Sequence, residues 1–349
     1  MKTSNSIQKF LLQRNKEQSE AYCSPDATLW RLQYRARHAT EIAALKCMDG
    51  RLNLSVLTET PPGIIQPFRN IGGQFDLGWP YFGILLNDWV KYSINRGRDC
   101  LILVTYHWSK GDEKRGCRGF DHDVEAARTY TRKLKEQIEF VFGSMHYVVY
   151  PIQVGIETDE DALVLHGADG SVLDLGSEPK NAEGDLTSQI KKLYPDMRER
   201  MVNDLLPLLV GNLAHIKKIR LSHRPIEDTE HKEQILAIGR GFDWLHLPNK
   251  ALIIGPYSYN LGDPVATAAR ILLSNLNEGR IPKATGGVLM TSAAFREEVG
   301  AERTIAAEKA KSLAEFAMGT ITEHVPELLP YLTSLTGVLN METRLFTPL

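Results

Sequence analysis

The sequence predicts an α/β fold that is present twice along the chain. Between residues 41 and 155, short apolar runs alternate with longer helical segments, which is typical of a mostly parallel sheet covered by helices. After residue 231 an outline of the same pattern recurs. Hydrophobic residues make up 43% of the 349 residues, which is ample for a sizeable core.

The first 40 residues are polar, with apolar residues at helical spacing such as Ile7, Phe10 and Leu11. This spacing predicts one or two surface helices. Because such helices have no core of their own, we expect an N-terminal helical arm (1–40) that packs on another part of the protein or on a neighbouring chain.

Residues 41–156 form the first predicted sheet domain. The run AALKC is a strand that ends at Cys47, and CLILVTYH is a second strand that ends at His107. YFGILLNDWVKYSINRG and DHDVEAARTYTRKLKEQIEFVFG have the pattern of helices, and YVVYPIQVGI that of a third strand. Strand, helix, strand, helix and strand in this order predict crossover connections between parallel strands.

Residues 157–230 are expected to form a connecting hairpin and a helical segment. The hairpin carries Asp159, Asp161 and Asp169 in turn-like stretches rich in Gly and Ser. Their spacing lacks the pattern of a calcium-binding loop, so we expect solvated turns here. The segment MRERMVNDLLPLLVGNLAHIKKI that follows has the pattern of a helix.

Residues 231–349 are expected to form a diverged repeat. QILAIGRGFDWL has the outline of AALKCMDGRLNL, and a helix ending in NEGR before GGVLMTS parallels one ending in NRGR before CLILVTY. Ala237 takes the place of Cys47, and Ser292 and Ala293 stand near the place of His107. Coincidence between two α/β units remains an alternative to duplication.

Charge and hydropathy exclude several classes of protein. Lys and Arg number 41 against 43 Asp and Glu, so the net charge of −2 gives no electrostatic reason to expect nucleic acid or an anionic membrane as partner. The chain shows no signal peptide and no apolar run long enough for a membrane span, so we expect a cytoplasmic protein.

Cysteine and histidine suggest a metal site at the edge of the first sheet. Cys47 and His107 end predicted strands, and Cys117 follows ten residues after His107. Because strand ends at one edge of an α/β sheet assemble sites, these residues can meet. Two thiolates and one imidazole suit zinc and leave the fourth tetrahedral position open, which is the arrangement of a catalytic site. Taken singly, a buried structural cysteine is the commoner case.

The remaining cysteines, Cys23 and Cys100, are expected to bind no metal. Four cysteines in a chain of this length do not form a disulfide framework.

The motif residues resemble those of a known family. Cys47-Met48-Asp49-Gly50-Arg51 resembles the Cys-x-Asp-x-Arg signature of β-class carbonic anhydrases, and Arg69-Asn70-Ile71-Gly72-Gly73 resembles their Arg-Asn-Ala-Gly segment. Nine residues separate His107 from Cys117, where most members have two. This long segment, the ligandless second half and the stretch GIETDEDALVLHG make the chain most similar to the carboxysome shell carbonic anhydrases.

The resemblance implies a mixed sheet core flanked by helices, internally duplicated, and a zinc enzyme that interconverts carbon dioxide and bicarbonate. Cys47, His107 and Cys117 would bind Zn²⁺, which lowers the pKa of bound water. Asp49 would orient the zinc-bound hydroxide, and Arg51 would pair with Asp49 and keep it ionised and away from the metal. If that contact breaks, Asp49 could become a fourth ligand and close the site.

Other residues are weaker candidates. His122 could transfer protons, although a helix-start residue is the commoner reading of its position. Six residues are expected to line or back the pocket, although a core role is the commoner one for the aromatic members: Gln66, Phe68, Ile71, Trp79, Tyr81 and Phe82.

Two alternative functions remain open at this point. One is a zinc hydrolase of another small heterocumulene, carbon disulfide or carbonyl sulfide. The other is a non-catalytic scaffold with a structural zinc, marked by a fourth protein ligand.

The resemblance also implies a homodimer or larger homo-oligomer, with carboxysome components as candidate partners. Carboxysomal relatives carry a substantial N-terminal domain, whereas about 40 residues precede Cys47 here. On this ground the cytoplasm is expected rather than the carboxysome.

Overall fold

The computed structural model describes residues 4–177, 185–225, 229–245, 247, 250–258 and 260–349. The chain divides into two compact units. The first-sheet unit comprises Leu29–Cys47 and Leu52–Thr229. The second-sheet unit comprises Met1–Thr28, Met48–Arg51 and Glu230–Leu349.

The first-sheet unit is built on a six-stranded mixed sheet in the order β2-β1-β3-β4-β5-β6. Strands β2, β1, β3 and β4 are parallel, whereas β5 and β6 are antiparallel. The parallel strands are rich in apolar residues and mostly buried because both of their faces are covered. The strands are β1 (Thr40–Cys47), β2 (Ile65–Asn70), β3 (Asp99–Trp108), β4 (Val149–Glu157), β5 (Ala162–His166) and β6 (Val172–Asp174).

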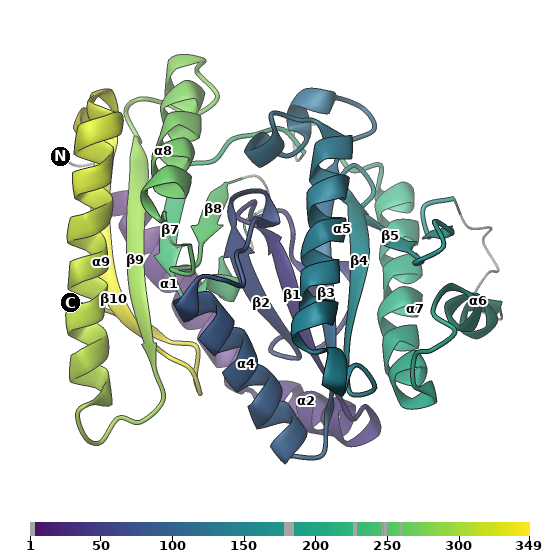
Figure 1. Cartoon of the computed structure of the whole chain (residues 1–349). Helices are drawn as coiled ribbons and strands as arrows, with labels where there is room; N and C mark the ends of the chain where they lie inside the picture. Colours follow the sequence, from purple (N-terminus) through teal and green to yellow (C-terminus); the bar gives the residue numbers. More distant parts are fainter. Residues whose placement is uncertain (1–3, 178–184, 226–228, 246, 248–249, 259) are drawn as a thin grey trace. The chain divides into compact units, whose positions relative to one another are not determined.

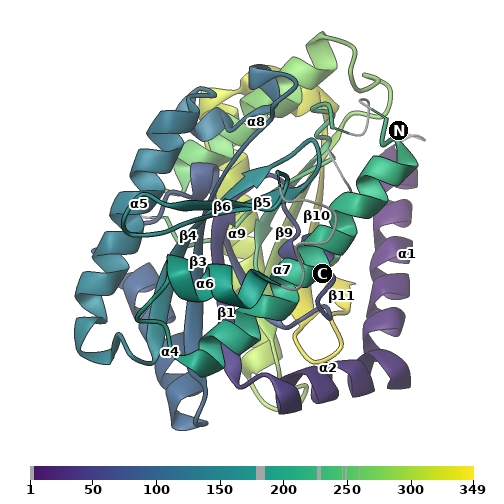
Figure 2. The ribbon, with the colours of Figure 1, turned by 90° about the vertical axis from the view of Figure 1, so that its right-hand side faces the viewer.

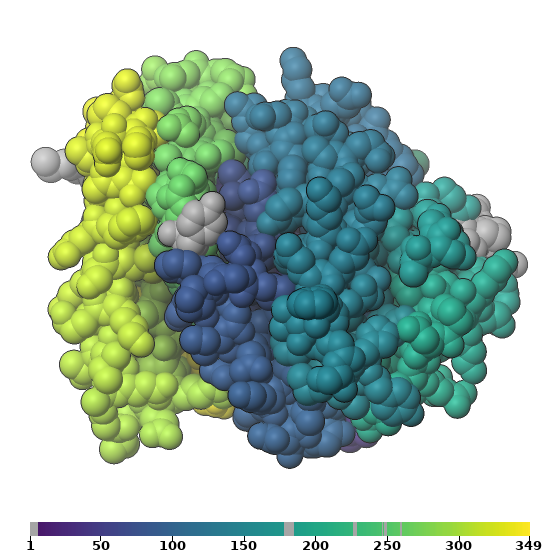
Figure 3. Space-filling view, viewed as in Figure 1, coloured from purple at the N-terminus to yellow at the C-terminus, as the bar shows by residue number. Residues whose placement is uncertain are grey.

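Helices cover both faces of this sheet. α4 and α5 pack over the parallel strands on one face, and their side chains close over that face in the space-filling view (Figures 1 and 3). α7 packs against β1 and β5 on the other face (Figure 2). The helices of this unit are α2 (Pro25–Arg37), whose residues up to Thr28 belong to the second-sheet unit, α3 (Leu54–Leu57), α4 (Pro80–Asn95), α5 (Val124–Val141), α6 (Leu186–Leu193) and α7 (Glu199–Ser222).

The second-sheet unit repeats this topology. Its sheet has the order β8-β7-β9-β10-β11, which matches β2-β1-β3-β4-β5, again with four parallel strands and an antiparallel last strand. The predicted α/β class and its internal duplication are thereby confirmed. The elements are α1 (Ser4–Cys23), β7 (Ile235–Gly239), β8 (Ala251–Ile254), α8 (Gly262–Asn277), β9 (Gly287–Phe295), α9 (Glu302–His324), β10 (Leu332–Asn340) and β11 (Phe346–Pro348).

The N-terminal helix α1 packs on the second sheet. Leu11 is fully buried in the apolar cluster of that sheet, whereas Phe10 is 54% exposed. The Asn15 side-chain amide donates to the carbonyl oxygen of Arg344 (3.0 Å) and accepts from the Phe346 N–H (2.7 Å). Because Asn15 satisfies backbone groups beside β11, the helix is fixed by polar as well as apolar contacts.

A buried tyrosine–histidine pair links β3 and β5. The Tyr106 hydroxyl and His166 Nε2 lie 2.8 Å apart, and both side chains are buried. Burial and the charge of Arg128 lower the pKa of His166 to about 4. His166 is therefore neutral in the folded chain at pH 7.

From this buried pair we predict that the protein becomes less stable as the pH falls below about 6.5. Between pH 6.5 and about 4 the unfolded chain binds a proton on His166 that the folded chain does not, so the free energy of unfolding decreases as pH falls through this window. The loss is at most about 3 kcal/mol. His166→Gln should flatten the dependence in urea unfolding at pH 7 and pH 5. The exposed His223 is the control, and His223→Gln should leave the slope unchanged; an equal slope in both variants would contradict the assignment.

Of the helices that the structure describes, none combines the length and the apolar composition that a membrane span requires.

Candidate metal centre

Neighbouring strands bring the predicted site residues to one edge of the first sheet. β1 and β3 run parallel, with Leu45 paired to Val104, so the two strands end side by side. Cys47 is the last residue of β1 and His107 the penultimate residue of β3. Cys117 follows a short 3₁₀ turn, Glu113–Arg115, in the segment after β3.

The structure brings together Cys47, His107 and Cys117. One ligand atom of each lies within 4.8 Å of the others, and all three residues are at least 95% buried. The two Sγ atoms are 3.9 Å apart. Neither ring nitrogen of His107 has a hydrogen-bond partner among the described residues, although both are buried. Because a buried imidazole without partners is costly, this donor set fits a site that is completed by a metal ion.

The spacing of the two sulfurs agrees with zinc. Two thiolates at about 2.3 Å from a tetrahedral zinc ion would stand about 3.8 Å apart. The observed Sγ–Sγ distance of 3.9 Å is close to this value and too long for a disulfide. Three protein donors would leave one tetrahedral position for solvent. The corresponding strands of the second sheet, β7 and β9, contain no cysteine or histidine.

Glycines allow the turn after β2 to approach this centre closely. Gly73 has a φ of +66°, and a Cβ atom there would lie 2.9 Å from the carbonyl oxygen of Thr105. A Cβ atom on Gly119 would lie 2.7 Å from the backbone nitrogen of Gly72. Larger residues would therefore push apart the turns that follow β2 and Cys117.

Asp49 and Arg51 form a buried ion pair within the second-sheet unit. Asp49 Oδ1 accepts from the backbone N–H of Arg51 (2.9 Å), and Oδ2 accepts from Arg51 Nε (3.0 Å) and Nη2 (2.6 Å). Both residues are at most 6% exposed. The carboxylate is therefore held in one orientation by a two-pronged contact.

Backbone bonds tie this ion-pair turn to strand β8. The Gly50 N–H donates to the carbonyl oxygen of Ala251 (2.9 Å), and the Ile253 N–H donates to that of Met48 (2.7 Å). A Cβ atom on Gly50 would lie 2.5 Å from the Ala251 oxygen, so this position requires glycine. Strand β8 of the second-sheet unit thus supports the Asp-Arg turn.

One titratable residue of the second-sheet unit escaped the sequence analysis. His231 Nδ1 bonds to Glu233, which is 1% exposed and also accepts from Asn275 (3.0 Å). Burial favours neutral His231, but the charge and hydrogen bond of Glu233 outweigh it and raise the pKa. The charges of Arg51 and Asp49 also act on His231, in opposite senses. Its sequence signal is a His-x-Glu directly before a strand.

The weaker candidates for the pocket lining differ in burial. Phe68 and Phe82 are fully buried and meet edge to face at 5.9 Å, as core residues do. Trp79 and Tyr81 are 38% and 48% exposed. Gln66 and Ile71 are half-buried.

His122 lies just before α5, where its backbone N–H donates to the carbonyl oxygen of Cys117 (3.0 Å). Its role as a proton shuttle stays a prediction. Cys100 is buried in β3, and burial raises the pKa of its thiol to about 12, which makes it a poor metal ligand. Cys23 is exposed at the end of α1.

The expectation of solvated turns is correct for Asp169, which is exposed, and wrong for Asp159 and Asp161. The Asp159 side chain is 23% exposed and binds the segment that leads to Cys117, and Asp161 pairs with Arg224 (2.8 Å) and His215 (3.0 Å). These partners lie far away in sequence, so no local pattern indicated them.

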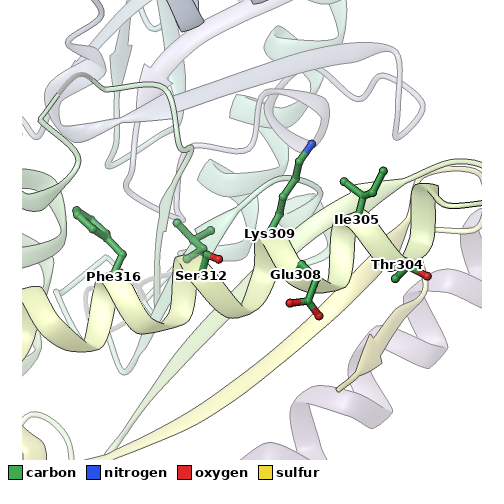
Figure 4. A pocket seen from close by; sticks show the side chains of 7 residues that line it. Thr304, Ile305, Glu308, Lys309, Ser312 and Phe316 are labelled. Carbon is green, nitrogen blue, oxygen red and sulfur yellow. The ribbon is translucent and has the colours of Figure 1, made fainter.

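A hollow of about 570 Å³ lies along α9 in the second-sheet unit (Figure 4). Its lining, which includes Ile305, Glu308, Lys309 and Phe316, comes from one helix. Because it holds no cluster of convergent polar groups, it lacks the features of a catalytic site.

No protein-family model matches the chain. The chain is similar to curated proteins named carboxysome shell carbonic anhydrase. The one from Prochlorococcus marinus (strain MIT 9313) is 26% identical over 271 residues, which cover 67% of this chain and 51% of the relative. The one from Parasynechococcus marenigrum (strain WH8102) is 28% identical over 240 residues, 58% of this chain and 40% of the relative. The chain spans about half the length of the curated relatives it matches. The predicted resemblance to this subgroup is confirmed.

Proposed function

Because the chain is similar to carboxysome shell carbonic anhydrases, we propose that it is a zinc-dependent carbonic anhydrase that interconverts carbon dioxide and bicarbonate. The observation that carries this proposal is the buried convergence of Cys47, His107 and Cys117 on one point. The resemblance in motifs and the duplicated sheets support the same activity.

Cys47, His107 and Cys117 would hold the zinc ion. When bound, the ion supplies a Lewis acid that makes hydroxide available near neutral pH. Two thiolates donate more charge to the metal than imidazoles do. We therefore expect this donor set to need a higher pH for activity than a three-histidine site needs.

Asp49 and Arg51 would orient the attacking oxygen. Both Asp49 oxygens accept from Arg51, which fixes the carboxylate and balances its charge. A fixed carboxylate can accept a hydrogen bond from the nucleophile and aim its lone pair at carbon dioxide. The occupied oxygens of Asp49 also support a state in which Asp49 is not itself a metal ligand.

The names of the relatives place those proteins in the carboxysome shell, so we propose carboxysome components as partners of this chain. We also propose a homodimer or larger assembly, which the resemblance in motifs implies. Light scattering on purified protein should give a mass of at least two chains. A monomer at micromolar concentration would contradict the assembly.

Metal removal tests the proposed function directly. Purified protein should contain about one zinc per chain and hydrate carbon dioxide in a stopped-flow assay. Dialysis against a strong chelator should abolish hydration, and added zinc should restore it. Stoichiometric zinc without hydration at alkaline pH would contradict the enzyme and favour a structural metal.

A further inference from the structure

The segment between His107 and Cys117 is bonded to the turn that joins β4 to β5. Asp159, in this turn, accepts from the backbone N–H of Gly111 (2.7 Å) and from the hydroxyl of Ser109 (2.9 Å). Arg115 Nη2 lies 3.5 Å from the same carboxylate. One side chain thus contacts the segment at three points before Cys117.

Glu157 adds a second tie from the end of β4. It is completely buried, and its carboxylate accepts from the backbone N–H groups of Lys110 (3.1 Å), Asp159 (2.9 Å) and Glu160 (3.0 Å). The pKa of Glu157 is raised, because burial raises it by more than these three hydrogen bonds lower it. The carboxylate therefore joins the segment and the turn to one strand end.

The β4–β5 turn is also bonded to Arg224 and to helix α7. Arg224 donates to the carbonyl oxygen of Thr158 (2.7 Å) and to Asp161 (2.8 Å), and His215 of α7 also bonds to Asp161 (3.0 Å). The β4–β5 turn is therefore a fixed support and not a loose hairpin.

Close packing leaves the segment little freedom. A Cβ atom on Gly111 would lie 2.5 Å from Arg115 Nη2 and 3.0 Å from Asp159 Oδ2. A Cβ atom on Gly116 would lie 2.9 Å from the carbonyl oxygen of Glu113. Gly111 thus allows the backbone to lie directly against the Asp159 carboxylate, and Gly116 allows the segment to turn tightly on its own Glu113 carbonyl group.

This support has a consequence for metal binding. The segment of nine residues would lose conformational entropy each time it placed Cys117 beside His107. If the segment is already ordered by Asp159 and Glu157, that cost does not reduce the affinity for the metal. Groups that orient a ligand in this way commonly contribute a factor of about 10–100 to metal affinity.

We propose that Asp159, with Glu157, is a positioning residue that holds the 109–116 segment so that Cys117 meets Cys47 and His107. This inference rests on the proposed function only in taking these three residues as metal ligands. It does not depend on which substrate the centre acts on.

Asp159→Asn tests the proposal. The variant should bind zinc about 10–100-fold more weakly in competition with a chromophoric chelator. Its cobalt(II) form should show a weaker thiolate-to-cobalt absorption band, because Cys117 reaches the ion in only part of the molecules. Asp169→Asn removes the same charge from the exposed turn between β5 and β6 and should match the wild type. A folded Asp159→Asn protein with wild-type zinc affinity and cobalt spectrum would overturn the proposal.

Ser109 provides a second pair of variants in case Asp159→Asn does not fold. Ser109→Ala removes one donor to Asp159 and should weaken zinc binding a few-fold, and Ser109→Thr should restore it by returning the hydroxyl. Unchanged affinity in Ser109→Ala would overturn the proposal. Wild-type protein that binds zinc but does not hydrate carbon dioxide would refute the proposed function and leave this inference intact, whereas no zinc binding at all would overturn both.

Discussion

Cys47→Ser is expected to lose zinc and with it the proposed hydration of carbon dioxide. A serine hydroxyl remains protonated at neutral pH and is a poor zinc ligand, so two protein donors would remain. The position is 5% exposed, and water has little room to replace the missing sulfur. We expect less than about one tenth of the wild-type zinc content, and hydration reduced at least about 10³-fold. Metal analysis after dialysis and stopped-flow rates measure both.

Cys100→Ser is the matched control. Cys100 is also fully buried in the first-sheet unit, and its thiol, with a pKa of about 12, stays protonated. The substitution should cost some stability but retain zinc. A Cys47→Ser protein that keeps one zinc per chain, or a Cys100→Ser protein that loses it, would contradict the ligand assignment.

The strand ends of the first sheet could be predicted because the signal is local. An apolar run that stops at Cys47, and another that stops next to His107, define both the strands and the edge at which they meet. Parallel order then follows from the helices between them. The repeat was visible for the same reason, since each half buries the same kind of strand under the same kind of helix.

The surroundings of the centre could not be predicted because their contacts are remote. Asp159 binds Gly111, 48 residues earlier, and Gly50 bonds to Ala251 in the other half of the sequence. The sequence around an aspartate in a glycine-rich stretch does not show whether its carboxylate will face solvent or accept a hydrogen bond from a remote backbone N–H. His231 was missed although its partner Glu233 is only two residues away, because the burial of Glu233 and its bond from the remote Asn275 exist only in the folded chain.

Asp49→Ala is expected to separate metal binding from turnover. The ligand set is unchanged, so zinc content should stay near one per chain. Without the carboxylate, the nucleophile has no fixed acceptor to orient it, and we expect kcat to fall about 10²-fold or more. Removal of Asp49 also leaves Arg51, which is 6% exposed, without its charge partner, so a loss of about 3 kcal/mol in stability is expected as well.

Arg51 allows the orienting role to be separated from the structural one. Arg51→Lys keeps the charge but cannot make the two-pronged contact of Nε and Nη2 with Asp49. If orientation of Asp49 matters, this variant should retain zinc and most of its stability and still lose about tenfold or more in kcat. Zinc content, urea unfolding and stopped-flow rates, measured on Asp49→Ala and Arg51→Lys, distinguish the orienting role of the ion pair from a structural one. A wild-type kcat in Asp49→Ala would rule out the orienting carboxylate, and zinc loss in that variant would instead make Asp49 a ligand.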